Sequence, residues 1–387
     1  MAKRKIRVNG EMPFGNVCDV AVRESDDATE VSFAADPHGG PESLWFCFRV
    51  SAEGSGAATR RVRLTLRHSR NMLGLGEPEN ARPVVRYADG DWDRLGPPHV
   101  ETLGDGRRLV SWTIDTPRTH ADVAFCYPYG GEEVGRLLKQ CIGFWRADAI
   151  GVSQGARPLI RLSNDHGGEG SDRPGLYLIA RQHSGETPGS WVLDGFLRYI
   201  ATLGEDAPMV WCVPLTNIDG VEQGDYGKDN FPYDLNRAWA RPPMRHETLV
   251  FQRDVSSWKA RCRGMLGIDF HAPGGTEKDG VYLHLCRPER LPEKHRATLG
   301  WAEAIKDALT PQYAAEDFAR TPDYPSRWET PNFTEYFCES VDVPAFVVET
   351  PYAMVGDLVL TREHYQDIGR RMAGAVVRRL SELSGQA

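Results

Sequence analysis

Three residues in the second half of the chain have the types and spacing needed to bind a metal ion. His183 and Glu186 lie three residues apart on a glycine-containing turn, so an imidazole nitrogen and a carboxylate oxygen can face one ion. His271 follows the apolar run 265–270 and can supply a third ligand. Zinc accepts this mixture of nitrogen and oxygen ligands. Taken singly, the first pair also fits a solvated helix start, and His271 a hydrogen-bonded core histidine.

Two further positions carry side chains suited to peptide or amide chemistry. Glu349 follows the apolar run 345–348, where a carboxylate is costly to bury without a partner. It suits general-base work if it faces metal-activated water, or it pairs with an arginine such as Arg237 in a structural ion pair. Asn236 and Arg237 can hold a substrate carboxylate by charge-assisted hydrogen bonds. A helix start capped by Asp234 is the alternative interpretation of that segment.

Short apolar runs precede most of these polar groups and predict the strands that position them. The runs cover residues 176–180, 209–213, 265–270 and 345–348. Helical spacing of apolar residues predicts a helix over residues 190–200 and a final surface helix over residues 365–383. Ligands bind outside the carboxyl ends of strands in α/β sheets, so we expect the candidate residues to converge at one edge of a mixed, largely parallel sheet.

The N-terminal part of the chain has a different pattern. Short alternating runs between residues 31 and 128 are broken by Gly, Pro, Asp and Asn, which favours an all-β module, either a sandwich or a jelly-roll-like arrangement. We predict an N-terminal antiparallel β-sandwich domain over residues 1–128 and an α/β domain over residues 129–387.

Composition excludes several classes of partner. With Lys+Arg 46 against Asp+Glu 54, the net charge of −8 lacks the basic surface typical of nucleic-acid or anionic-membrane binding. The N-terminal segment has positive charges but no apolar stretch behind them, and no apolar run approaches a membrane span, so we expect a cytoplasmic protein. The eight cysteines are scattered singly, which predicts buried thiols in a reducing compartment.

The ordered set of motifs resembles the zinc carboxypeptidases of the carboxypeptidase A superfamily, most closely their cytosolic branch. The resemblance spans most of the chain, because an N-terminal β-sandwich domain precedes the catalytic α/β domain in that branch. In the catalytic domain it rests on HSGETPGSW at 183–191, LDGFL at 193–197, NIDGV at 217–221, DLNR at 234–237, DFH at 269–271 and Glu349. In the N-terminal domain it rests on residues 44–50, 80–87, 92–96 and 125–129.

The resemblance implies a zinc-dependent metallocarboxypeptidase that hydrolyses the C-terminal residue of a peptide or protein tail. His183, Glu186 and His271 would bind one zinc ion per chain and leave a coordination position open. Glu349 would take a proton from the attacking water and later give it to the leaving amine. Asn236 and Arg237 would hold the terminal carboxylate of the substrate.

Two departures from the cytosolic branch bear on the substrate. Gly227 stands where that branch has an arginine that stabilises the oxyanion. Either Lys228, one position further on, or another donor replaces it as a substrate-binding group, or the substrate differs. After His271 the chain reads Ala-Pro-Gly-Gly-Thr, without the second histidine and basic residues usual in the branch. The polyglutamate specificity of the tubulin-processing members is therefore not expected here.

Four further side chains are candidates for the substrate pocket. A pocket for acidic side chains needs a cation, for which Arg327 and Lys278 are candidates, and Tyr324 or Tyr352 can contribute a phenol.

Two other functions compete with the carboxypeptidase. The first is a zinc-dependent amidase or deacylase acting on a small acylated amino acid or another non-peptide amide, which the missing arginine favours. The second is an inactive scaffold that binds partners through its β-domain, which the retained ligand set and Glu349 argue against.

Overall fold

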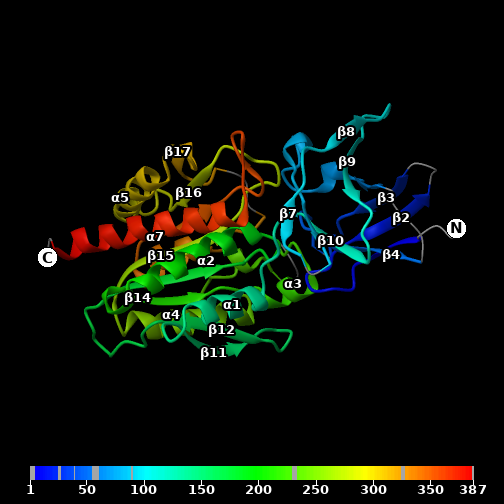
Figure 1. Cartoon of the computed structure of the whole chain (residues 1–387). Helices are drawn as coiled ribbons and strands as arrows, with labels where there is room; N and C mark the ends of the chain where they lie inside the picture. The colour runs from blue at the N-terminus through cyan, green and yellow to red at the C-terminus, as the bar shows by residue number, and fades with distance from the viewer. Residues whose placement is uncertain are drawn as a thin grey trace.

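Two five-stranded sheets and one eight-stranded sheet dominate the computed structural model (Figure 1). The structure describes residues 5–24, 28–38, 40–54, 61–88, 90–228, 233–323 and 327–385. In Figure 1 the smaller sheets, coloured blue to cyan, lie at one end of the molecule, and the large sheet with its helices forms the other end. The fold is therefore mixed α/β, as the sequence pattern predicts.

The two smaller sheets are built from residues 5–124. The first has the order β1 (Lys5–Asn9), β4 (Cys47–Glu53), β10 (His120–Ala124), β6 (Val84–Tyr87) and β7 (Trp92–Arg94), with antiparallel pairs throughout. The second has the order β2 (Cys18–Glu24), β3 (Ala28–Ala34), β5 (Arg61–Leu66), β9 (Arg108–Asp115) and β8 (His99–Thr102). Phe33 of β3 contacts Phe48 of β4 with ring centroids 4.7 Å apart, so side chains of the two sheets meet in a shared apolar layer.

One pair in the second sheet departs from the expected antiparallel arrangement. β3 and β5 run parallel, with Ala28 opposite Arg61 and Phe33 opposite Leu66. The connection between them passes through β4, which belongs to the other sheet, so the chain crosses over and returns in the same direction. The prediction of a purely antiparallel N-terminal module is wrong at this pair. The predicted domain boundary at residue 128 stays a prediction.

The eight-stranded sheet contains the strands whose C-terminal ends lead to the candidate site residues. Its order is β11 (Arg146–Val152), β12 (Pro158–Ser163), β14 (Met209–Val213), β13 (Pro174–Ala180), β15 (Arg263–His271), β18 (Ala345–Glu349), β16 (Val281–Leu285) and β17 (Ala314–Arg320). The central neighbours β14, β13, β15 and β18 are parallel, whereas β11, β12 and β16 join by antiparallel pairs. This is the mixed sheet with a parallel centre that the apolar runs predict.

Helices cover both faces of this sheet. Successive side chains of β13 point to opposite faces and contact different helices. Leu176 and Leu178 belong to the apolar cluster that contains residues of α2 (Thr187–Thr202) and α7 (Arg362–Gly385). Tyr177 faces the other way and meets Trp258 of α4 (His246–Lys259) with ring centroids 5.6 Å apart. The remaining helices are α1 (Gly131–Gln140), α3 (Ile218–Gln223), α5 (Pro292–Leu309) and α6 (Phe333–Tyr336).

The predicted final helix is present as α7, which lies lengthwise beside α2 (Figure 1). Glycines let these helices approach closely: a Cβ at Gly195 would lie 2.1 Å from the Gln366 oxygen, and one at Gly369 would lie 1.9 Å from the Val192 oxygen. The tight contact fixes α2, whose N-terminus carries a candidate metal ligand.

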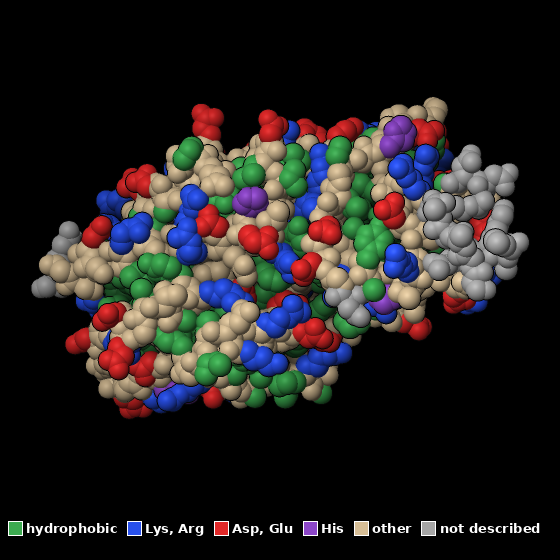
Figure 2. Space-filling view, viewed as in Figure 1, with side chains coloured by type: hydrophobic (Ala, Val, Ile, Leu, Met, Phe, Trp, Pro, Cys, Tyr) green, Lys and Arg blue, Asp and Glu red, His purple; other side chains and the backbone are tan. Residues whose placement is uncertain are grey.

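The surface carries mixed charges. Figure 2 shows acidic and basic side chains interspersed on the face in view, with apolar side chains distributed among them. No helix within the described ranges combines the length and the apolar composition needed to cross a bilayer. All eight cysteines are free, and six of them are buried, as their scattered positions predict.

Candidate metal and catalytic site

The three candidate metal ligands come from the ends of neighbouring parallel strands. β13 ends at Ala180, and His183 lies in the turn that leads from it to α2. Glu186 is the N-cap residue of α2, and His271 is the last residue of β15. β13 and β15 pair in parallel up to Ala180 and Phe270, so both chains leave the sheet at the same edge. The expected convergence at one sheet edge is what the fold produces.

The donor atoms of these residues form a compact buried group. Glu186 Oε1 lies 2.8 Å from His183 Nδ1, and Glu186 Oε2 lies 2.7 Å from His271 Nδ1. One donor atom from each residue fits within 4.8 Å of the others, the geometry of a metal site. The three residues are only 6%, 3% and 2% exposed, in chain order. Such polar burial is tolerable because each group compensates the charge of another.

Further carboxylates and a phenol surround the donor group. His183 Nε2 lies 3.3 Å from Asp234 Oδ1, and His271 Nε2 lies 2.8 Å from Asp269 Oδ2. Contacts of this kind fix the ring orientation and tautomer of metal-binding histidines. The Tyr226 hydroxyl donates to Glu186 Oε1 at 3.2 Å. The sequence did not indicate Tyr226, because a tyrosine in a loop carries no spacing signal.

Charge compensation also sets the protonation of the histidines. Burial opposes the charged form of His183, but Glu186 and Asp234 outweigh it and raise its pKa to about 9. The pKa of His271 is likewise raised well above its ordinary value despite burial, because Asp269 and Glu186 face it. In the absence of metal, both imidazoles are therefore in the doubly protonated, positively charged form at pH 7.

Glu349 lies directly beside the donor group. It is the last residue of β18 and pairs in register with His271 of β15. Its Oε2 is buried and accepts no hydrogen bond from the described residues. Burial raises the pKa of Glu349 to about 7, an effect that outweighs the attraction of His271. A carboxyl group poised near neutral pH is suited to receive and return a proton.

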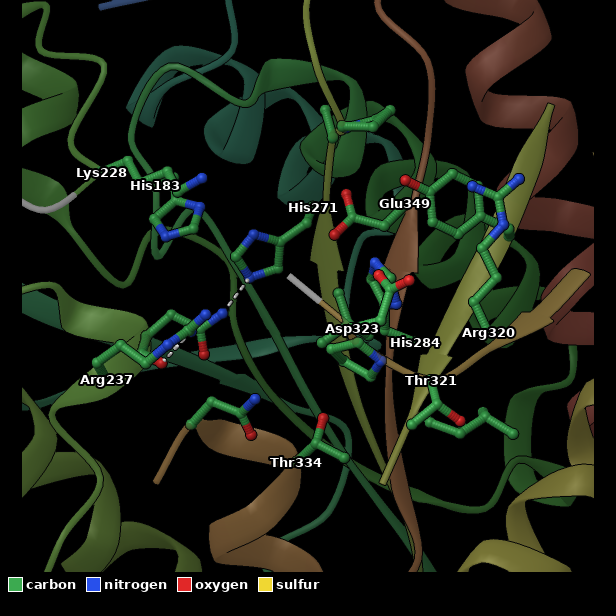
Figure 3. Close-up of a pocket in the computed structure, with 18 of the residues that line it drawn as sticks. His183, Lys228, Arg237, His271, His284, Arg320, Thr321, Asp323, Thr334 and Glu349 are labelled. Carbon is green, nitrogen blue, oxygen red and sulfur yellow. Dashed lines mark hydrogen bonds between the residues drawn. The ribbon is translucent and has the colours of Figure 1, made fainter. Parts of the chain in front are cut away.

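These residues line one cavity of about 670 Å³. His183, His271 and Glu349 lie next to one another on its wall, with Lys228 beside His183 (Figure 3). Arg237 lines the same cavity, with Nη1 donating to the Asn236 carbonyl at 2.8 Å. The structure thus brings all seven sequence-predicted site residues together around one space: His183, Glu186, Lys228, Asn236, Arg237, His271 and Glu349.

A hydrogen-bond network orients Asn236. Its Oδ1 accepts from Gln182 Nε2 at 3.0 Å and from the Phe333 backbone at 3.3 Å. The Trp239 indole in turn donates to Gln182 Oε1 at 2.7 Å. With Oδ1 occupied, the Asn236 amide turns its Nδ2 toward His271, 3.4 Å away. The helix-start interpretation also holds here, because Asp234 accepts from the Asn236 backbone at 2.9 Å.

The structure explains why no arginine stands at position 227. Gly227 has φ +82°, and a Cβ there would lie 2.1 Å from Ser184 Oγ and 2.7 Å from the Ser184 nitrogen. A side chain at this position would displace the turn that carries His183. Lys228, one residue on, reaches the cavity instead.

The other pocket candidates from the sequence do not line this cavity. Arg327 is 54% exposed and pairs with Glu42. Lys278 is absent from the lining, and Tyr324 lies outside the described residues. Tyr352 is buried elsewhere, with its hydroxyl donating to the Gly185 carbonyl at 3.4 Å.

A row of side chains across β18, β16 and β17 forms the other side of the cavity. Val347 is opposite His284, and His284 is opposite Arg320, so the three share one sheet face. Figure 3 shows His284 and Arg320 on the side away from His183. Burial and the adjacent Arg320 lower the pKa of His284 to about 4, so its imidazole is neutral. The sequence did not predict this row, because the alternation of side chains in each strand shows which residues share a face only when the pairing of β16 with β17 and β18 is known.

No known protein-family model matches the sequence. Among curated proteins, the chain is 25% identical over 335 residues to cytosolic carboxypeptidase 2 of Xenopus tropicalis, covering 75% of this chain and 33% of that protein. It is 29% identical over 226 residues to human cytosolic carboxypeptidase 6, covering 53% of this chain and 44% of that protein.

Among solved structures, the fold matches a metallo-carboxypeptidase from Burkholderia cenocepacia with a TM-score of 0.75 at 20% identity, covering 98% and 99% of the two chains. It also matches a metallo-carboxypeptidase from Pseudomonas aeruginosa with a TM-score of 0.72 at 18% identity, covering 97% and 100%. The sequence matches confirm the predicted resemblance to the cytosolic carboxypeptidases, and the structural matches show that the fold is that of the bacterial metallo-carboxypeptidases.

The match to the curated cytosolic carboxypeptidases is partial on their side. The chain spans 33% of the Xenopus protein and 26% of mouse cytosolic carboxypeptidase 1. The similarity therefore concerns a portion of these longer proteins.

Metal binding should release protons and strengthen as the pH rises. Coordination needs neutral Nδ1 atoms, whereas His183 and His271 are protonated at pH 7 without metal, because their pKa values are raised, that of His183 to about 9. Affinity for Zn²⁺ should increase between pH 6 and 9, by about tenfold per pH unit for each proton released. Calorimetric titration of metal-free protein in two buffers of different ionisation enthalpy measures the proton count.

Asp234→Asn is the matched control, because it removes one carboxylate beside His183 without touching a donor atom. It should reduce the number of protons released. An affinity that is constant across this pH range would contradict the protonation state inferred for the donor group.

Proposed function

We propose that the chain is a zinc-dependent metallocarboxypeptidase that hydrolyses the C-terminal residue of a peptide or protein tail. The observation that carries the proposal is the placement of Glu349 beside the His183, Glu186 and His271 donor group, in a cavity that Arg237 also lines. A metal site, a proton acceptor and a cation for a terminal carboxylate are the three parts that the reaction needs. The curated relatives are named cytosolic, and we extend this compartment to the chain as part of the proposal.

The donor set fits zinc. Two imidazole nitrogens and one carboxylate oxygen within 4.8 Å of each other are a common ligand set of catalytic zinc, which keeps a fourth position open. The outer contacts of His183 and His271 to carboxylates are those that accompany zinc-binding histidines. Bound there, Zn²⁺ would supply Lewis-acid activation of the scissile carbonyl and the attacking water.

Glu349 is the group that moves the proton. Its carboxylate removes a proton from the attacking water, and the resulting acid then protonates the nitrogen of the leaving residue. The pKa near 7 makes both directions of transfer accessible at neutral pH. The partly buried setting keeps bulk water from competing for the buried Oε2.

Asn236 and Arg237 are proposed to hold the terminal carboxylate of the substrate. The Asn236 amide presents Nδ2 because its oxygen is already engaged. The Arg237 guanidinium belongs to the next residue and lines the same cavity. Charge-assisted contacts of this kind would orient the last residue of the chain and select against internal peptide bonds.

Lys228 is proposed to stabilise the oxyanion that forms on the scissile carbonyl. Its side chain lies next to His183 in the cavity (Figure 3). The backbone at position 227 has no space for a side chain, so a cation cannot be supplied from there. A single well-placed donor to an oxyanion contributes about 3 kcal/mol to catalysis.

Replacement of Glu349 should separate binding from turnover. Glu349→Gln keeps the shape of the side chain but cannot accept a proton, so kcat should fall by roughly 10²- to 10⁴-fold. Metal content, measured by elemental analysis, should stay at about one zinc per chain. His183→Ala is the contrasting variant and should lose the metal. An undiminished rate in Glu349→Gln would remove the proposed mechanism.

The carboxylate clamp distinguishes the peptidase from the alternative function. Peptides with a free C-terminus should be cleaved with a kcat/KM roughly 10- to 100-fold above that of C-terminally amidated peptides. The reason is that the amide loses charged hydrogen bonds that contribute about 1.5–3 kcal/mol. Arg237→Gln should abolish most of this preference. Equal cleavage of both substrates would instead favour a zinc-dependent amidase or deacylase of small amides, the function suggested by the glycine at position 227.

A further inference from the structure

The N-terminal region, residues 5–124 with the two five-stranded sheets, forms part of the wall of the cavity that contains the candidate site. Leu73 and Gly74 line the same cavity as His183 and Glu349. Their carbonyls accept hydrogen bonds from the segment that follows His271: the Gly275 nitrogen donates to Leu73 at 3.1 Å, and the Thr276 hydroxyl donates to Gly74 at 2.7 Å. The N-terminal region therefore holds a loop that begins at a candidate metal ligand.

This contact leaves no space for adjustment. Gly74 has φ +65°, and a Cβ there would lie 2.3 Å from the Gly274 Cα. A Cβ at Gly275 would meet the Leu44 side chain at 2.5 Å. The backbones of the two regions thus touch, and the position of the segment around Leu44 is fixed relative to the cavity.

Glu42 projects from this fixed segment toward Lys228. Its Oε2 lies 3.4 Å from Lys228 Nζ, and the two side chains are only 12% and 26% exposed. That oxygen is buried and accepts no hydrogen bond from the described residues, so the lysine ammonium compensates its charge. The carbonyl of the adjacent Ser43 accepts from the Leu73 nitrogen at 2.9 Å, which fixes the backbone next to Glu42.

The second oxygen of Glu42 contacts the residue before Trp328. Glu42 Oε1 lies 2.7 Å from Arg327 Nη1. Trp328, the next residue, lines the cavity and packs against Tyr233 with ring centroids 3.9 Å apart and the rings tilted by 36°. One carboxylate from the N-terminal region therefore connects two segments that border the cavity.

We propose that Glu42 is a positioning residue for the reaction: it holds the Lys228 ammonium at the cavity wall, where the oxyanion forms. The proposal rests on the proposed function of Lys228. A lysine is a point charge on a flexible four-carbon chain, so a fixed counter-ion is needed to aim it. Lys228 also follows a glycine at φ +82°, which does not itself constrain the side chain. The N-terminal region would thus contribute to catalysis through a charge that it supplies.

The kinetic test is a double-mutant cycle. Glu42→Gln keeps the shape of the side chain and removes its charge, and kcat should fall by about tenfold with KM within twofold, a part of the loss expected for a missing oxyanion donor. Lys228→Gln should lose more. The Glu42→Gln, Lys228→Gln double variant should be no slower than Lys228→Gln alone, because both changes act through one group. Glu42→Asp, which retains the charge, should recover part of kcat.

Glu53→Gln is the matched control, since Glu53 belongs to the same region but pairs with Arg7 at an exposed position. It should leave kcat unchanged. Zinc content and melting temperature of the Glu42 variants should stay at the wild-type values. Wild-type kcat in Glu42→Gln, or a multiplicative loss in the double variant, would overturn the proposal.

A second measurement does not depend on turnover. Mass spectrometry after brief acylation with an amine-reactive ester should show increased labelling of Lys228 in Glu42→Gln. Only the neutral amine attacks the ester, and without the Glu42 carboxylate the ion pair no longer favours the protonated, unreactive form. Labelling of the exposed Lys139 on α1 should not change. Unchanged labelling of Lys228 would overturn the pairing itself. An enzyme that lacks carboxypeptidase activity but shows the labelling change would contradict the proposed function and leave the ion pair standing.

Discussion

The burial of Glu186 between two imidazoles is the interaction on which the rest of the site depends. A carboxylate that is 3% exposed is costly without compensation, and the structure supplies it from His183 and His271 at 2.8 and 2.7 Å. Each imidazole is then balanced on its other nitrogen by Asp234 or Asp269. The charges therefore alternate through the protein interior, and each charged group is compensated by its neighbours. A divalent cation at the same donors would replace the protons that the imidazoles carry in its absence.

The parallel register of the central strands converts this local balance into a catalytic arrangement. Because β15 and β18 pair with His271 opposite Glu349, a candidate ligand and the proposed general base leave the sheet side by side. The antiparallel neighbour β16 places Tyr282 opposite Glu349, which completes the sheet edge. Helix α2 delivers Glu186 from its N-cap, and the glycines of α2 and α7 fix that helix against the fold. Backbone pairing and helix packing thus position Glu186, His271 and Glu349.

The residues that the sequence predicted are those that follow strong local patterns. His183, Glu186, His271 and Glu349 each come after an apolar run, and the topology of an α/β sheet brings such positions together. Residues on the far side of the cavity, such as His284 and Arg320, could not be found this way, because their shared face depends on the register of β16 and β17. The parallel pairing of β3 and β5 was also missed, since only the path of β4 through the other sheet makes it necessary. Local periodicity reports which face of an element is buried, but it does not report which element lies opposite.

Glu42 illustrates the same limit at the level of domains. Its sequence neighbourhood suggests only a solvated turn before a strand, and the role of its charge becomes visible when Lys228 and Arg327 are placed around it. The predicted boundary at residue 128 divides the chain by pattern, yet Leu73 and Gly74 line the same cavity as the metal donors. Backbone contact between Gly74 and Gly274 means that the N-terminal region cannot shift without moving the segment that begins at His271. Two regions with separate sheets therefore share one cavity, and a change in how they pack would reach the proposed oxyanion site directly.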